Sequence, residues 1–157
     1  GNEGLNPQKT EPTNPLYSLD KQQSSLVYYD KNTIVLTMPY WVKVTNSSVE
    51  DSEVKKHSFV LSYDPEAMTA SDTKLKLYIS HVVEDAGETV TRSNFTYAYR
   101  AYSIRAALAA FKEKTGKLPK YLELTAEINN SKDELVDKDG KETSVERSVE
   151  YDYAFTE

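Results

Sequence analysis

Two histidines, His57 and His81, are the residues of this sequence that could act as a general base for a serine nucleophile. Such catalysis also needs a sharp turn or paired backbone amides to stabilise an oxyanion, and the sequence has no Gly-x-Ser-x-Gly motif. Both histidines fall in phase with apolar positions of alternating segments. We therefore expect two histidines that complete a hydrophobic core, and we assign no catalytic residue.

The acidic segment at residues 133–140 invites comparison with a calcium-binding loop. Asp137, Asp139 and Gly140 fall at suitable positions, but Leu135 stands where the first aspartate belongs. The five glycines are scattered singly and form no phosphate-binding loop, and the absence of cysteine removes thiolate ligands and disulfides. The sequence thus predicts neither a metal site nor a cofactor.

The chain contains 12 tyrosines, and tyrosine offers a rigid amphipathic surface to sugars and to other proteins. The densest groups are two clusters, and the predicted binding residues are Tyr97, Tyr99, Arg100 and Tyr102 in one and Tyr40 and Trp41 in the other. Tyrosine is also a good strand residue, which is the alternative explanation of both clusters.

Charge and hydropathy exclude several classes of partner. The net charge is −6 and the basic residues form no stripe, which argues against nucleic acid and anionic membranes. No apolar run approaches the roughly 18 residues of a membrane helix, so this chain is not expected to insert into a membrane directly. A protein or a glycan stays open as a partner.

The elements that must position these residues are mainly strands. Alternation of apolar and polar residues predicts strands in residues 33–45, 57–63, 74–83, 90–99, 122–128 and 145–155. Pro39 lacks a backbone N–H and places its strand at an edge or bulge. The turn at residues 84–88 predicts a hairpin between its two flanking strands, and Asp139-Gly140 predicts a second tight turn.

One short helix is expected at residues 103–115, with Ser103 as its N-cap and Gly116 as its C-cap. Ile104, Leu108 and Phe111 give it one apolar stripe. Together with about seven strands, this predicts an all-β, mainly antiparallel fold: a two-layer, immunoglobulin-like β-sandwich. A closed barrel is the alternative.

The first residues have no hydrophobic period and contain Pro7 and Pro12. We expect residues 1–16 to be a flexible N-terminal tether or linker, because such a segment buries too little to offset its ordering entropy. Residues 17–157 are then a single β-sandwich domain. A tether of this kind suits an exported bacterial lipoprotein with a lipid anchor upstream.

Three segments resemble the NigD-like lipoproteins of Bacteroides-type bacteria. They are His57-Ser-Phe-Val-Leu-Ser-Tyr-Asp-Pro65, Leu75-Lys-Leu-Tyr-Ile-Ser-His81 with its Glu84-Asp-Ala-Gly87 turn, and Tyr97-Ala-Tyr-Arg-Ala-Tyr-Ser103. The resemblance covers roughly residues 32–129 and implies the C-terminal β-sandwich domain of that family. It implies an envelope lipoprotein and carries no known active site.

These observations predict a non-enzymatic module of the cell envelope that binds a protein partner or a glycan. It would be exported and lie at the bacterial outer membrane surface or in the periplasm. The alternatives are a structural accessory domain without a small ligand and, third, a hydrolase with unidentified carboxylates.

Overall fold

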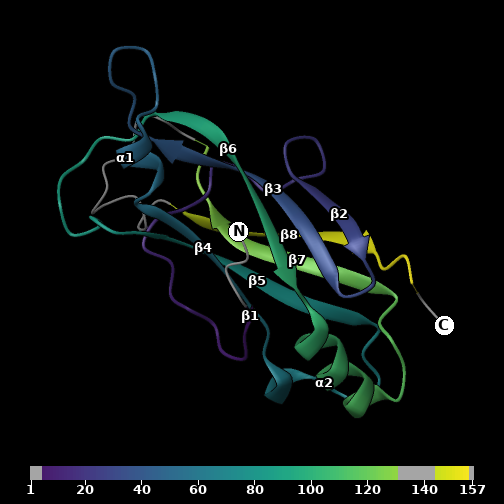
Figure 1. The fold of residues 1–157 in the computed structure, drawn as a ribbon. Helices are drawn as coiled ribbons and strands as arrows, with labels where there is room; N and C mark the ends of the chain where they lie inside the picture. The colour runs from purple at the N-terminus through teal and green to yellow at the C-terminus, as the bar shows by residue number, and fades with distance from the viewer. Residues whose placement is uncertain (1–4, 131–143, 156–157) are drawn as a thin grey trace.

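The computed structural model describes residues 5–130 and 144–155, and eight strands account for most of their regular structure (Figure 1). The strands are β1 (Leu5–Asn6), β2 (Ser25–Asp30), β3 (Thr33–Val42), β4 (His57–Ser62), β5 (Lys74–Val83), β6 (Asn94–Ser103), β7 (Tyr121–Ile128) and β8 (Val145–Asp152). The helices are α1 (Asp51–Val54), the 3-10 turn η1 (Pro65–Ala67) and α2 (Arg105–Thr115).

The strands form two sheets that lie in two layers (Figure 1). The smaller sheet has the order β2-β3-β6 and is wholly antiparallel. The larger sheet has the order β1-β4-β5-β7-β8 and is mixed, because β1 pairs with β4 and β5 pairs with β7 in parallel. The predicted mainly β fold in two layers is confirmed, with a larger sheet that is not purely antiparallel.

The core lies between the layers and is built from alternate residues of the long strands. Ile34, Leu36 and Met38 of β3 are buried on the inner side of the smaller sheet. Leu75, Leu77 and Ile79 of β5 and Leu122, Leu124 and Ala126 of β7 are buried in the larger one. Burying alternate apolar residues fixes the register, because a slip by one residue would expose the whole set.

Helix α2 connects β6 of the smaller sheet with β7 of the larger one and lies at one end of the layers (Figure 1). Ile104, Leu108 and Phe111 are buried, as the apolar stripe predicts. Gly116 has the positive φ of a C-cap, at 80°. The predicted N-cap is wrong by one residue: Ile104 stands there, without a side-chain hydrogen bond, and Ser103 still belongs to β6.

Two strand predictions need correction or qualification. β5 and β6 do not form a hairpin, because the turn after Val83 takes the chain across to the other sheet, where β6 pairs with β3 over all ten of its residues. Pro39 lies within β3, the middle strand of its sheet, but the ladder with β2 has already ended at Thr37. On that side its carbonyl accepts a hydrogen bond from the Tyr17 N–H and Leu16 bridges Tyr40, so the segment before β2 covers this position and the expected sheet edge is not found.

Residues 5–16 differ from the flexible tether expected. β1 adds to the edge of β4, and residues 10–16 lie along β5 and β7. The Thr13 N–H donates to the His81 carbonyl at 2.9 Å, and Leu16, which is completely buried, bridges β3 and β7 through Tyr40 and Ile128. We call residues 10–16 the strap. The expectation was wrong because backbone hydrogen bonds and one leucine fix a segment whose side-chain pattern shows no period.

Within the described parts of the chain, no helix has both the length and the apolar character needed to cross a membrane. The acidic segment at residues 133–140 and its predicted Asp139-Gly140 turn lie outside the described residues.

Candidate functional site

The structure divides the six predicted binding residues between the two sides of the smaller sheet. Tyr97 and Tyr99 of β6 point outward and are 39% and 65% exposed. Tyr102 and Arg100 lie in the opposite phase, toward the core, where the Tyr102 hydroxyl donates to the Phe59 carbonyl at 2.6 Å and the Arg100 guanidinium lies 5.1 Å from the Phe59 ring centroid. The alternation of the strand already separates these two pairs.

The second predicted cluster is buried. Tyr40 is 2% exposed and packs against the rings of His57, Phe59 and His81. Trp41 belongs to the outer side of the sheet, but it is only 5% exposed, and its indole N–H donates to the Asn129 carbonyl. Neither ring is therefore available as a contact surface in this structure.

Apolar and aromatic side chains remain exposed on the outer side of the β2-β3-β6 sheet. We call this surface the aromatic face, and its exposed members are Val27, Phe95, Tyr97 and Tyr99. Phe95 is held in place, because Tyr17 stacks on it with ring centroids 4.0 Å apart, and Tyr17 in turn meets the edge of Trp41 at 5.0 Å. Tyr97 in turn meets the edge of the Phe95 ring at 5.9 Å, so these two exposed rings pack against their neighbours.

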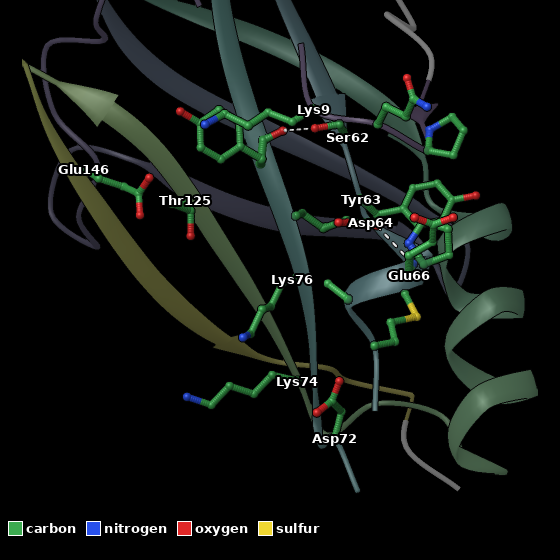
Figure 2. A pocket seen from close by; sticks show the side chains of 17 residues that line it. Lys9, Ser62, Tyr63, Asp64, Glu66, Asp72, Lys74, Lys76, Thr125 and Glu146 are labelled. Atoms are coloured by element: carbon green, nitrogen blue, oxygen red, sulfur yellow. Dashed lines mark hydrogen bonds between the residues drawn. The ribbon is translucent and has the colours of Figure 1, made fainter. Parts of the chain in front are cut away.

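A hollow of about 620 Å³ lies on the outer side of the larger sheet (Figure 2). Its walls are residues 7–9 on one side and η1 with its flanking residues on the other, and its floor includes Lys76 and Tyr78 of β5. Lys9 lies over the Tyr78 ring, with Nζ 4.3 Å from the centroid. Positively charged lysines and negatively charged carboxylates both line the hollow. The lining therefore favours neither a cationic nor an anionic ligand.

The Tyr78 hydroxyl has no hydrogen-bond partner among the described residues. Burial, followed by the charges of Glu127, Glu146 and Glu11, raises the pKa of Tyr78 to about 12. The phenol is therefore protonated at neutral pH and can donate a hydrogen bond, but it cannot serve as a base there.

A buried network of charged groups joins α1, β4, β5 and the loop before β6. The Arg92 guanidinium binds the Glu53 carboxylate with both Nε and Nη2, at 2.8 and 3.2 Å, and Nη2 also binds Asp85 at 2.8 Å. The Glu53 Oε2 atom further accepts from the Lys43 N–H at 2.9 Å. Lys56 completes the network with an ion pair to Asp85 at 3.0 Å. Glu53 and Arg92 are each 2% exposed.

The two histidines continue this network into the core. His57 Nε2 lies 3.0 Å from Glu53 Oε2, His57 Nδ1 lies 2.8 Å from His81 Nε2, and His81 Nδ1 lies 3.0 Å from the carbonyl oxygen of Pro15. Both rings are buried, as the sequence predicts. A carboxylate and two histidines in line resemble catalytic machinery, yet here the line ends on the backbone of the strap and reaches neither the hollow nor the aromatic face. Its role in this structure is to connect elements.

No group of three or more histidine, cysteine or acidic side chains suited to a metal ion occurs in the part of the chain that is described. Sequence reasoning missed Glu53, Asp85 and Arg92, because charged residues in loops normally indicate solvent exposure. No local pattern marks the contact between Glu53 and Arg92, which are 39 residues apart. The Phe95 side chain, in phase with Tyr97 and Tyr99, could have been added to the predicted surface from the alternation alone.

Comparison with known proteins points to a bacterial protein of similar fold. No protein-family model matches the sequence, and no curated protein matches it. The fold is similar to that of a putative lipoprotein from Bacteroides fragilis, with a TM-score of 0.76. That protein is 26% identical in sequence, and the match covers 98% of this chain and 70% of the other. The chain is therefore similar in fold and, more distantly, in sequence to this Bacteroides fragilis protein.

Proposed function

We propose that this protein is a non-enzymatic module of the bacterial cell envelope that binds a partner through the aromatic face. The observation that carries the proposal is the row formed by Phe95, Tyr97 and Tyr99, exposed side by side on the outer side of β6. Exposed apolar surface of this kind is typical of interaction sites, and tyrosine is enriched among the residues that dominate binding.

A protein partner is favoured over a glycan. Val27 and Phe95 have no polar atoms in their side chains, and both are at least 40% exposed on this face. Burying such side chains against another protein is favourable by roughly 25 cal/mol per Å². The tyrosine hydroxyls leave a glycan as the second candidate, because a ring flanked by a hydroxyl can both stack on a sugar and hydrogen-bond to it.

The lipoprotein likeness supports the location in the envelope. We place the protein at the outer membrane surface or in the periplasm, held by a lipid anchor upstream. The finer assignments to the NigD-like family and to an immunoglobulin-like arrangement of strands belong to the same proposal.

The proposal is tested by binding to immobilised protein, with an envelope extract for protein partners and a glycan array for sugars. We expect Tyr97→Ala combined with Tyr99→Ala to weaken the interaction at least tenfold, which corresponds to about 1.4 kcal/mol. Tyr121→Ala is the matched control, because Tyr121 lies on β7 in the larger sheet. Equal binding by the double variant and the control would contradict the proposal. Absence of any ligand in both assays would favour a structural accessory domain.

A further inference from the structure

Strand β6 leaves one of its two long sides unpaired. Within the residues that the structure describes, β6 pairs with β3 alone, over ten residues and without a shift of register (Figure 1). An unpaired strand edge presents a row of backbone N–H and C=O groups, which is a template for pairing with another chain. The row borders the aromatic face, because Phe95, Tyr97 and Tyr99 belong to the same strand.

The contacts of Pro39 show which residues of β6 turn their backbone groups toward this free edge. Pro39 lies opposite Tyr97 and has no N–H, and its carbonyl accepts from the Tyr17 N–H. Tyr17 belongs to the segment before β2, which bridges to β3 on the side away from β6. Pro39 and Tyr97 are therefore a non-hydrogen-bonded pair, and the N–H and C=O groups of Tyr97 point away from β3. Because the ladder alternates without a bulge, those of Phe95 and Tyr99 point to the free edge as well.

The other three outer edges of the two sheets each carry a feature that discourages pairing with another chain. β1 has only two residues, and β2 has a register shift between Tyr28 and Asp30. β8 is rich in charged side chains, namely Glu146, Arg147, Glu150 and Asp152. Short strands, bulges and charges are the usual protections of a sheet edge. β6 has none of them, because it is long and regular, and Arg100 is its one charged residue.

A second copy of β6 fits this edge in an antiparallel register with Tyr97 on the two-fold axis. Phe95 of each copy then lies opposite Tyr99 of the other, and the two Tyr97 residues face each other. Every exposed ring of the strand thus meets an aromatic partner, which is a favourable cross-strand pairing. The neighbouring registers with the same edge groups leave one ring of each strand without such a partner. Arg100 lies opposite Asn94, so no like charges meet at the junction, although each chain carries a net charge of −6.

We propose that this protein forms a two-fold symmetric homodimer in which the β6 strands of two copies pair antiparallel. Phe95, Tyr97 and Tyr99 of each copy donate one N–H each, which gives about six hydrogen bonds across the junction. The Tyr99 carbonyl already accepts from Arg100 Nη1 at 3.1 Å, and its second lone pair serves the other copy. The assembly closes on itself, because the same edge is used by both copies. It joins the two aromatic faces side by side and adds to the proposed function without depending on it.

Disulfide formation in single-cysteine variants of the purified protein tests this inference, because the chain has no cysteine of its own. In the dimer, the Cα atoms of the two copies of position 97 lie about 5.5 Å apart, as in any hydrogen-bonded antiparallel pair. A disulfide spans roughly 4.4 to 6.8 Å between Cα atoms, so Tyr97→Cys should cross-link with itself on mild oxidation.

Tyr99→Cys is the matched control, because it is the same substitution on the same edge. The two copies of position 99 lie roughly 13 Å apart along the paired strands. Tyr99→Cys should therefore cross-link about tenfold less than Tyr97→Cys, since only chance collisions join its thiols. A mixture of Phe95→Cys and Tyr99→Cys should give the mixed dimer, because these two positions lie opposite each other. Equal cross-linking of Tyr97→Cys and Tyr99→Cys would overturn the proposal.

Sedimentation velocity of the wild-type protein provides a measurement that no substitution can disturb. We expect a reversible dimer whose fraction rises with protein concentration between about 1 and 300 μM, as mass action requires. A wild-type protein that stays monomeric over this range would overturn the proposal, whether or not its aromatic face binds another protein. Both experiments use the protein alone, so their failure is separate from a failure of the binding assays with envelope extract and glycans.

Discussion

Acid should destabilise this protein through His81 in particular. The ring is 1% exposed, and burial, followed by the charge of His57, lowers its pKa to about 3, whereas an unfolded chain titrates its histidines near pH 6.5. A histidine with a lowered folded-state pKa stays neutral when folded, so below pH 6.5 the unfolded state binds more protons. The stability that it contributes is complete above pH 6.5 and is lost as the pH falls toward 3.

The size of the effect follows from the two pKa values. Where the unfolded state holds one proton more than the folded state, each unit of falling pH lowers the free energy of unfolding by about 1.4 kcal/mol. Between pH 6.5 and 5.0 the histidine of the unfolded chain goes from half to almost fully protonated, while His81 in the folded protein stays neutral. This difference should lower the free energy of unfolding by about 1.6 kcal/mol. A Gln side chain at this position can donate to the Pro15 carbonyl and accept from His57, but it does not titrate.

Urea denaturation of the wild type and of His81→Gln at pH 6.5 and 5.0 measures the effect. The wild type should lose about 1.6 kcal/mol more than the variant over this interval, because the carboxylates contribute similarly to both proteins and only the wild type has a titrating group at position 81. The loss in the wild type alone is not diagnostic, since other groups titrate as well. Equal losses in the two proteins would refute the reasoning, because His81 would then be free to take up a proton in the folded state.

Three further substitutions test the packing and the buried charges, each by urea denaturation. Leu108→Ala should cost about 2 to 5 kcal/mol, because the stripe of α2 is buried; a cost below half a kcal/mol would place that side chain in solvent. Leu16→Ala should cost a similar amount, because Leu16 is completely buried; a near-neutral result would instead support a flexible N-terminal tether. Glu53→Ala should cost about 3 to 5 kcal/mol, because it leaves the buried Arg92 without its bidentate partner. A loss no larger than that of an exposed residue such as Glu66→Ala would contradict the last expectation.

The sequence predicted those strands and the helix in which buried apolar residues recur with the period of the element. The strands around Ile34, Phe59, Leu77 and Leu124 and the stripe of α2 follow directly from hydrophobic period, because one side of each element faces the core. The two histidines were placed in the core for the same reason. The same alternation separates Tyr97 and Tyr99 from Tyr102, although composition alone groups them together.

The parts that sequence could not predict depend on contacts between distant segments. The strap is fixed by backbone hydrogen bonds, which leave no trace in side-chain pattern, and by the single buried Leu16. Glu53 and Arg92 occur among other charged residues, and only the folded chain brings them to 2.8 Å. The turn after Val83 has the composition of a hairpin turn, but composition does not tell whether the next strand stays in the same sheet.

Site-specific photo-crosslinking in the native host tests the central claim most directly. A photoreactive phenylalanine analogue is introduced at position 97, at position 99, or at position 121 of the larger sheet, and the adducts are identified by mass spectrometry. We predict a defined protein or glycan adduct from positions 97 and 99 and none from position 121, because the partner covers the outer side of β6. An adduct that forms from position 121 but not from positions 97 and 99, or no adduct from any of them, would contradict binding through the aromatic face.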